Sequence, residues 1–301
     1  MPVTLQQLRY FVAVAEHGSF TATAHDLYTT QSNLSASVSD LERELGIEAF
    51  NRSSRGVTLT SAGVELLSYA RQVLEQVGML EDRYAQGAAT RSRLAISTQH
   101  YAFAVQAFLD IVDECAGKDF ELTLRETTTR QVIDDVASFR SDVGILYLSD
   151  YNERIISKAL ADANLTFTQL FSASVHAFMS KRHPLATRER VTLDELEPYP
   201  CYSFDQGTSN SFYYSEEPLS HLPHRQRVAI SDRATLTTLL VSTLGYTLSS
   251  GMLVPEMQPG VASIPVETSE SMRVGVVTHN GRVLDGLPEA YLERLHAIVG
   301  A

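Results

Sequence analysis

The chain has 301 residues, 44% of them apolar and 20% charged, and carries a formal net charge of −12. This size predicts two or three domains whose cores need no disulfide or metal support. No apolar run is long enough to span a membrane, and the first residues lack the layout of a secretion signal. Cys115 and Cys201 match no metal or redox spacing. We therefore expect a cytoplasmic protein with no cofactor, no metal and no membrane partner.

Hydrophobic periodicity predicts three short helices at the start of the chain, over residues 5–15, 20–28 and about 31–45. Thr30 is expected to cap the third helix and Gly46 to end it. Two short apolar stretches follow, around residues 49–50 and 57–59, and flank a polar tip that resembles a hairpin. Three helices and a hairpin make up a winged helix-turn-helix, so residues 1–60 are expected to form a DNA-binding domain.

The face of the third helix opposite its apolar stripe is small and polar, which lets a helix lie deep in the major groove. Gln31 and Asn33 can each bond an adenine edge, and Ala36 can meet a thymine methyl group. The alternative is an ordinary solvated helix face. The residues expected to contact DNA from this helix are Gln31, Ser32, Asn33, Ser35, Ala36 and Ser39.

Charge by itself does not predict DNA binding, because residues 1–60 hold four arginines against six acidic side chains. The case depends on where the arginines lie. Arg52 and Arg55 flank the hairpin tip, where they can reach phosphates or a minor groove. The alternative is a loop with two solvated arginines.

A long helix is expected from Ser61 to about Ala88, so residues 60–89 are assigned as a linker. From Gly63 onward its apolar residues recur in steps of three and four, which is a heptad seam typical of a coiled-coil dimer. The alternative is a helix packed on its own domain. The residues expected to dimerise are Leu66, Ala70, Val73, Val77, Leu80 and Tyr84.

From Leu94 onward, expected strands and helices alternate, which predicts α/β lobes with parallel sheets and helices on both faces. Strands are expected at 94–97, 120–125, 143–147, 175–180, 201–204, 227–231, 246–249 and about 272–278, and helices at 101–114, 130–139, 233–243 and about 286–299. Residues 90–301 are therefore expected to form a hinged, two-lobed ligand-binding domain. Its first lobe is expected at about 90–162 and 267–301, and its second at about 163–266.

A dense set of residues in the first 65 positions forms a specific pattern: Leu8 to Glu16, Gly18 to Phe20, Ala24, Leu27, Gln31, Leu34-Ser35, Leu41-Glu42, Leu45-Gly46, Phe50, Arg52 and Leu59 to Gly63. This pattern resembles the head of LysR-type transcriptional regulators. The resemblance implies a winged head, a linker helix and two lobes similar to type 2 periplasmic binding proteins. It also implies a homodimer or homotetramer that binds an interrupted inverted repeat in double-stranded DNA and responds to a small effector.

Two positions depart from the family pattern. Ser32 stands where a proline is common, and Ala36 where a basic residue is common, so the operator of a relative cannot be carried over. Gln99-His100-Tyr101 is similar to sub-branches that include regulators of cysteine and methionine metabolism. This likeness points to an amino-acid-like or sulfur-metabolism carboxylate as the effector.

The effector is expected beyond the carboxyl ends of the parallel strands. Hydroxyls, amides and helix N-termini there suit a carboxylate, Arg233 or Arg130 can pair with it, and Asp232 suits an ammonium group. The alternative is that each residue caps a strand end or forms a turn. The expected effector-binding residues are Ser97, Thr98, Gln99, His100, Thr129, Phe204, Thr208, Ser231, Asp232 and Arg233.

Enzymatic function is not expected, because none of the common nucleophile, phosphate-binding, zinc or dinucleotide motifs occurs. His221 and His224 are separated by Leu222-Pro223, which disfavours a shared metal-ligand face. Cys115 and Cys201 are expected in different lobes, which argues against a disulfide switch.

Overall fold

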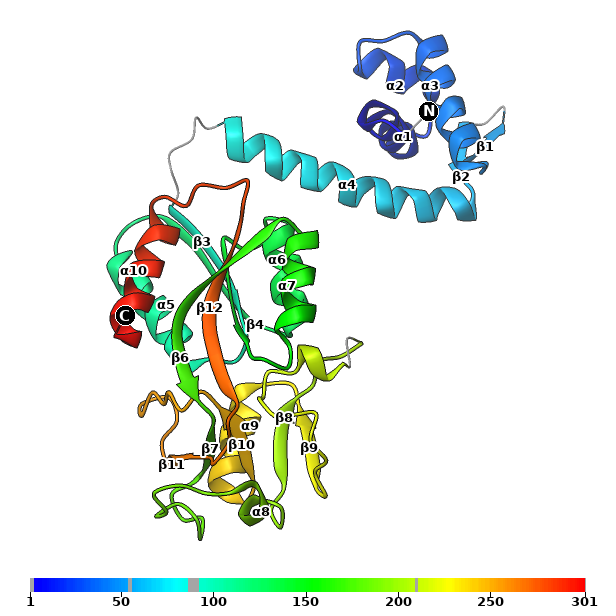
Figure 1. Cartoon of the computed structure of the whole chain (residues 1–301). Helices are drawn as coiled ribbons and strands as arrows, with labels where there is room; N and C mark the ends of the chain where they lie inside the picture. Colours follow the sequence, from blue (N-terminus) through cyan, green and yellow to red (C-terminus); the bar gives the residue numbers. More distant parts are fainter. Residues whose placement is uncertain (1–2, 54–55, 86–91, 209–210, 301) are drawn as a thin grey trace. The chain divides into compact units, whose positions relative to one another are not determined.

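The structure is a computed structural model that describes residues 3–53, 56–85, 92–208 and 211–300. It divides the chain into two compact units, Met1–Thr90 and Arg91–Ala301. The first unit is a helical head with a long helix, and the second is a two-lobed α/β domain (Figure 1). None of the described helices is long and apolar enough to cross a membrane.

The head begins with three helices, α1 Leu5–His17, α2 Phe20–Asp26 and α3 Gln31–Leu45. Side-chain oxygens of Thr4, Ser19 and Thr30 cap them by accepting backbone N–H bonds. The third helix ends at Gly46 in the left-handed conformation, as the sequence predicts. Local capping chemistry therefore fixes the ends of these helices.

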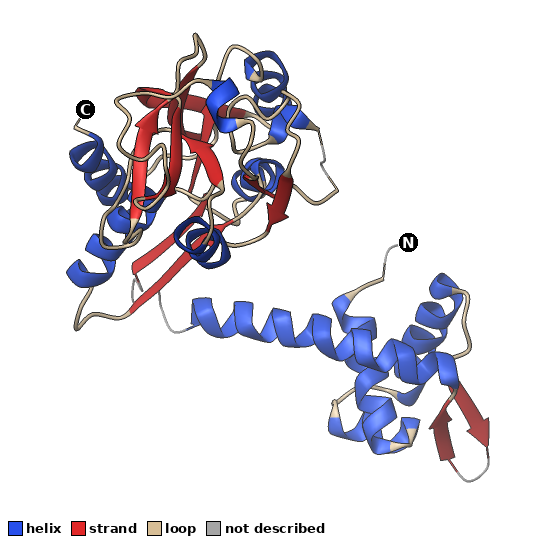
Figure 2. Cartoon of the chain, turned by 90° about the horizontal axis from the view of Figure 1, so that it is seen from below, coloured by secondary structure: helices blue, strands red, loops and turns tan. Residues whose placement is uncertain are grey.

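A two-stranded antiparallel hairpin follows, made of β1 Phe50–Ser53 and β2 Gly56–Leu59 (Figure 2). The Glu42 carboxylate of α3 holds the start of the hairpin by accepting bonds from the N–H groups of Ala49 (2.8 Å) and Phe50 (3.1 Å). Phe50 also packs its ring against Phe11, with centroids 5.1 Å apart. The hairpin is thus a wing anchored on the helices, and the expected winged helix-turn-helix is confirmed.

The long helix α4, Ser61–Ala85, begins where Thr60 Oγ1 accepts a bond from the Gly63 N–H at 2.9 Å. Its first half packs on the head, with Leu66 against the core and Ala70 only 1% exposed within it. Further along, Arg71 pairs with Glu16 of α1 at 2.9 Å. Part of the expected dimer seam therefore lies in the core of its own head.

A second row of apolar side chains on α4 faces outward, and we call it the outer stripe. Tyr69, Val73 and Leu80 are 61%, 43% and 56% exposed, and Val77 between them is half-buried. For Tyr84 the structure describes only the backbone. The outer stripe keeps the three-and-four spacing that lets one helix pack on another.

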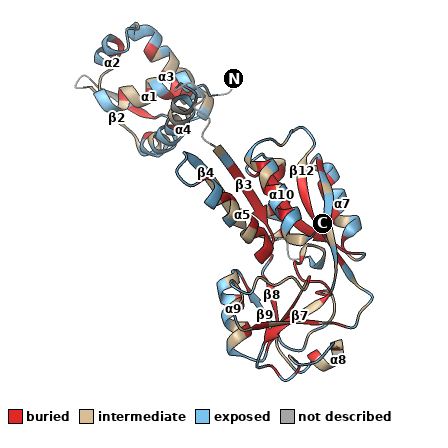
Figure 3. Ribbon diagram, turned by 90° about the vertical axis from the view of Figure 1, so that its left-hand side faces the viewer, coloured by how far each residue is buried: buried red, intermediate tan, exposed pale blue. Residues whose placement is uncertain are grey.

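The first lobe of the second unit is a five-stranded sheet in the order β4-β3-β5-β12-β6. Its strands are β3 Ser92–Thr98, β4 Phe120–Glu126, β5 Val143–Leu148, β6 Leu165–Ser174 and β12 Ser271–His279. One face is covered by α5 Ala102–Glu114 and α10 Leu287–Val299, and the other by α6 Thr129–Ala137 and α7 Glu153–Asp162. Figure 3 shows β3, which lies between β4 and β5, as a largely buried strand.

The second lobe is a five-stranded sheet in the order β11-β7-β10-β8-β9. Its strands are β7 His176–Ser180, β8 Cys201–Phe204, β9 Arg227–Ile230, β10 Tyr246–Ser249 and β11 Val261–Pro265. Helix α9, Arg233–Ser242, covers one face, and the short α8, Leu193–Leu196, covers the other. The short 3₁₀ helix η1, Phe212–Tyr214, lies in the loop between β8 and β9.

Two expectations for these lobes are wrong. The sheets are mixed rather than parallel, because β12 runs antiparallel to β5 and β6, and β7 runs antiparallel to β10 and β11. The boundary between the lobes lies near Val175 instead of 162/163, because β6 pairs with β12 in the first sheet. Strand β6 is not among the expected strands, because it is an edge strand whose exposed side chains are polar and no apolar run marks it.

The packing of α4 on the wing gives a stability prediction. A Cβ atom on Gly63 would lie 2.0 Å from the Ala49 carbonyl oxygen, a backbone atom that cannot move aside. Gly63→Ala is therefore expected to destabilise the head by about 1–3 kcal/mol or more.

Gly78→Ala on the same helix is the matched control, since nothing lies within 4 Å of its added Cβ. It is expected to stabilise the helix by about 0.5–1 kcal/mol. Denaturant unfolding of the full chain checks both, and equal stability of the two variants would contradict the packing described here.

Candidate functional site

The first candidate site is the exposed face of α3 in the head. Leu34, Val38 and Leu41 are fully buried on the inner side of the helix. Gln31, Ser32, Asn33 and Ala36 are exposed, and Ser35 and Ser39 are half-buried. Packing of the apolar stripe thus presents the small polar face that the sequence predicts.

Hydrogen bonds order the beginning of this face. Thr30 Oγ1 accepts a bond from the Asn33 N–H, and the Asn33 side-chain amide donates to Thr29 Oγ1, both at 3.2 Å. Arg52 lies opposite Val57 in the wing, and only its backbone is described. Arg55 lies outside the described residues.

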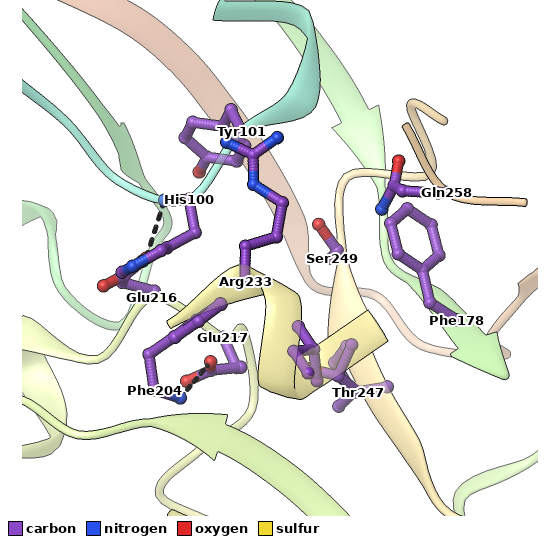
Figure 4. A pocket seen from close by; sticks show the side chains of 12 residues that line it. His100, Tyr101, Phe178, Phe204, Glu216, Glu217, Arg233, Thr247, Ser249 and Gln258 are labelled. Carbon is purple, nitrogen blue, oxygen red and sulfur yellow. Dashed lines mark hydrogen bonds and ion pairs between the residues drawn. The ribbon is translucent and has the colours of Figure 1, made fainter. Parts of the chain in front are cut away.

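The second candidate site is a small cavity between the lobes of the second unit. It lies where the carboxyl ends of the parallel strands of the two lobes meet, which is the expected place for a ligand in such folds. Figure 4 shows residues from both lobes around it. The lining residues are His100, Tyr101, Phe178, Phe204, Glu216, Glu217, Arg233, Leu236, Thr247, Leu248, Ser249 and Gln258.

His100 joins the two lobes at this cavity. It follows β3 in the first lobe, and its backbone N–H and ring Nδ1 lie 2.9 Å and 2.8 Å from Glu216 Oε2 in the second lobe (Figure 4). Its ring also stacks on Phe204, with centroids 3.7 Å apart and planes within 7°. Because both partners belong to the opposite lobe, these contacts hold the cleft closed.

Arg233 makes a second bond between the lobes. It is the first residue of α9, and its guanidinium pairs with the carboxylate of Glu126, the last residue of β4. Burial lowers the pKa of Arg233 to about 10, so the side chain stays charged at neutral pH. Its Nε atom is buried without a hydrogen-bond partner. The group is therefore a half-buried cation whose hydrogen-bonding capacity is only partly used.

Glu217 is a buried acid beside the same cavity, with only 4% of its surface exposed. Its Oε1 accepts a bond from the Phe204 N–H at 2.8 Å, and its Oε2 has no partner. Burial, and then the neighbouring Glu216 carboxylate, raise the pKa of Glu217 to about 8. The carboxyl therefore holds a proton at neutral pH.

A polar network supports the cavity from the first lobe. The Gln99 side-chain oxygen accepts bonds from the Tyr101 hydroxyl and the Tyr147 N–H, both at 3.1 Å, and its amide donates to Thr129 Oγ1. The N–H of Thr129, at the start of α6, donates to Gln206 Oε1 of the second lobe at 3.1 Å. This network fixes the loop that carries His100.

Several residues predicted from the sequence lie away from the cavity. Ser97 donates to Asp135 at 2.6 Å inside the first lobe, and Thr98 donates to the backbone oxygen of Gln99. Asp232 is exposed and caps α9 by accepting a bond from the Thr235 N–H at 2.8 Å, and these bonds lower its pKa. The remaining two, Thr208 and Ser231, are exposed.

His100, Phe204 and Arg233 are thus the predicted residues that line the cavity, with Gln99 and Thr129 directly behind His100. Sequence reasoning missed Glu216 and Glu217. Their only signal is two adjacent acids after the aromatic run Phe212-Tyr213-Tyr214, in a loop with little regular structure that sequence patterns do not place.

The two cysteines lie in separate cores, Cys115 in that of the first lobe and Cys201 in that of the second. Both are buried free thiols, and burial raises the pKa of Cys201 to about 12. Neither is placed to form a disulfide with the other. Among the described residues no group of side chains has the arrangement of a metal site.

A winged helix-turn-helix joined to a two-lobed α/β domain with a cavity between its lobes defines a DNA-binding regulator with an effector-binding domain. Residues 5–64 match the family model described as "Bacterial regulatory helix-turn-helix protein, lysR family". Residues 91–298 match the "LysR substrate binding domain" model. The chain therefore belongs to the LysR family of transcriptional regulators, and it is not an enzyme.

Individual relatives agree with this assignment. The chain is 26% identical over 298 residues to a "Hydrogen peroxide-inducible genes activator" of Dickeya chrysanthemi, covering 94% of this chain and 92% of that protein. It is 31% identical over 217 residues to the "Uncharacterized HTH-type transcriptional regulator YnfL" of Escherichia coli K12, covering 71% and 69%. The solved structure of an OxyR mutant of Corynebacterium glutamicum shares the fold, with a TM-score of 0.52, 24% identity and coverage of 100% and 94%.

The raised pKa of Glu217 predicts that the free energy of unfolding depends on pH. Its ordinary pKa is 4.5 and its pKa in the folded chain is about 8. Between these values the folded chain holds a proton that the unfolded chain releases. Stability is therefore expected to fall as pH rises from about 4.5 to about 8, by at most about 1.4 kcal/mol per pH unit, and to level off above that range.

Glu217→Gln removes the titrating group and keeps the size of the side chain. Urea unfolding of both proteins across this pH range measures the difference between them. A difference that does not change with pH would contradict a protonated Glu217.

Proposed function

We propose that this regulator responds to a small amino-acid-like molecule or related carboxylate bound between its lobes. One observation carries the proposal: two anion-binding groups at the cavity each hold a carboxylate of the chain itself. Glu126 lies on the guanidinium of Arg233, and Glu216 lies on the N–H of His100. A ligand carboxylate offers both groups the same chemistry.

Competition between the ligand carboxylate and the protein's own carboxylates explains how binding would change lobe closure. Each internal carboxylate comes from the lobe opposite its partner, so both pairs hold the cleft closed. A ligand that replaces Glu126 on Arg233 changes the contacts across the cleft and hence the free energy of closure. A difference of about 1–3 kcal/mol between two lobe arrangements is enough to couple the cavity to DNA binding.

Glu217 suits the other end of an amino-acid-like ligand. Its Oε2 is buried at the cavity without a partner. When an ammonium group binds there, the carboxyl gives up its proton and Oε2 accepts a hydrogen bond from the ammonium. Asp232, which the sequence favours for this role, already caps α9. The proposal therefore assigns ammonium recognition to Glu217.

Peroxide is the second candidate effector, because the Dickeya relative is named as a peroxide-inducible activator. A thiol that reacts with peroxide must ionise and be reached by it. Cys115 and Cys201 are buried in separate cores, and burial raises the pKa of Cys201. These facts favour a non-covalent effector over a cysteine switch.

We also propose that the chain binds an interrupted inverted repeat as a homodimer or homotetramer. The DNA contacts come from the exposed face of α3, at the positions Gln31, Ser32, Asn33, Ser35, Ala36 and Ser39, together with Arg52 and Arg55 of the wing. Dimerisation uses the outer stripe of α4, Tyr69, Val73, Val77 and Leu80, because Leu66 and Ala70 are occupied in the head core.

The effector proposal predicts opposite effects for the two members of one ion pair. Glu126→Gln frees Arg233 from its internal carboxylate and is expected to tighten binding of the effector about threefold to tenfold. Arg233→Met removes the anchor and is expected to weaken binding about tenfold or more. Calorimetry of the full chain against amino acids and O-acetylserine measures both changes.

Arg130→Met is the matched control, since Arg130 pairs with Asp134 on α6 and does not line this cavity. The Arg130→Met variant is expected to bind the effector with the affinity of the wild type. Binding of uncharged ligands alone, with Arg233→Met as tight as wild type, would overturn the proposed ligand class.

The dimer proposal predicts that charges on the outer stripe separate the subunits. Val73→Asp combined with Leu80→Asp would bury unpaired like charges between the helices, which is strongly unfavourable. Sedimentation is expected to show a smaller assembly. Val64→Asp is the control, because Val64 is also exposed on α4 (58%) but lies on the opposite side of the helix. An unchanged assembly in the double variant would refute the stripe as the dimer contact.

A further inference from the structure

The turn between α2 and α3 has an unusual residue at its centre. Helix α2 ends in a Schellman motif, in which the Tyr28 N–H donates to the His25 oxygen at 3.2 Å and the Thr29 N–H donates to the Ala24 oxygen at 3.0 Å. This motif requires a left-handed residue, and Tyr28 has a φ of 51°. Glycine is the usual choice, because a Cβ atom makes this backbone conformation unfavourable.

The chain uses glycine for the same purpose elsewhere. Gly18, Gly46 and Gly300 end α1, α3 and α10 with φ values of 65°, 68° and 72°. The tyrosine at the end of α2 is therefore an exception to the way in which these three helices end. The turn itself favours glycine, so an interaction of the tyrosine side chain must explain why Tyr28 occupies this position.

Contacts inside the head do not supply that reason. The described residues include three other non-glycine residues with positive φ, and each has an internal role. Leu219 is buried, Phe139 packs on His279 with centroids 4.3 Å apart, and Asn164 accepts a bond from Asn280 at 3.1 Å. Tyr28 is 99% exposed, so its ring gains nothing from the fold that would offset its backbone conformation.

The position of Tyr28 points to DNA. It lies two residues before Thr30, the N-cap of α3, and so within about 8 Å along the chain of the helix that presents the polar face. A phenol hydroxyl can donate to a phosphate oxygen, and its ring can pack on a deoxyribose.

The charge of the head adds a second reason. Residues 1–60 contain four arginines and no lysine. Two of these arginines already have acidic partners, Arg9 with Glu81 at 2.9 Å and Arg43 with Asp40 at 2.5 Å. A head with so few available cations needs neutral donors to hold the sugar–phosphate backbone.

We propose that Tyr28 is a DNA-contact residue that binds the sugar–phosphate backbone beside the groove entered by α3. The chain keeps a strained, fully exposed aromatic residue because its contact is made only in the complex with DNA. The proposal concerns the DNA-binding head and is independent of the effector.

Tyr28→Gly tests this directly, because it should relax the turn while it removes the contact. Binding is measured with the full chain on two duplexes, one selected by the wild-type protein from a random library and one of unrelated sequence. The expected result is a loss of about threefold to tenfold in affinity on both duplexes. The slope of log affinity against log salt should stay unchanged, because a neutral phenol releases no counterions.

Two measurements separate this contact from a structural role. Amide hydrogen exchange in α2 and α3 should be no faster in Tyr28→Gly than in the wild type, since glycine fits the turn better. Phe139→Gly, the same type of change at an aromatic residue in the other unit, should leave DNA affinity unchanged. Asn33→Ala should weaken binding to the selected duplex alone, by about tenfold or more, if Asn33 reads a base.

Wild-type affinity of Tyr28→Gly on both duplexes would overturn the proposal. A loss accompanied by faster exchange in α2 and α3 would also overturn it, because Tyr28 would then act through the fold. A loss confined to the selected duplex would replace the backbone contact by a base contact, and so contradict the proposal as stated.

Discussion

The pairing of β6 with β12 is the constraint on which the effector domain depends. The two strands run antiparallel from Ser271–Ser174 to His279–Leu165, and each continues the chain to or from the second lobe (Figure 1). Because these two segments carry the chain between the lobes, the carboxyl ends of the remaining parallel strands face one another across a cleft. The relative position of the lobes then depends on side chains that meet there. A few polar contacts in the cleft therefore determine how the two lobes are positioned.

Those contacts join ionisable side chains that are buried or half-buried. Glu216 contacts His100, and Glu126 forms an ion pair with Arg233. Burial and the neighbouring Glu216 raise the pKa of Glu217. Buried ion pairs contribute little net stability, but leaving one partner uncompensated is strongly unfavourable. The cleft is therefore sensitive to any small molecule that satisfies one partner and frees the other. The same property makes it a better switch than an apolar interface of equal size.

In the head, the electrostatic question is how a net acidic domain binds DNA. It belongs to a DNA-binding family, yet its first 60 residues are net acidic, so its affinity cannot come from a broad basic surface. Caps of α3, small polar side chains and the wing place a few hydrogen-bond donors close together. Such an interface should depend less on salt than that of a lysine-rich head, because fewer counterions are released when it binds.

The sequence by itself determined the head almost completely. Its helices follow from local periodicity, and their ends from Thr30, Gly46 and Thr60, all of which act within a few residues of their own positions. Tertiary structure decided the rest. Whether Ala70 faces a partner or its own core depends on α1, and β6 is recognisable only once β12 lies beside it. The cavity shows the same limit, because Glu216 lies 116 residues from His100. Helical periodicity and capping are local interactions, whereas a contact between side chains so far apart in the sequence depends on the path of the whole chain between them.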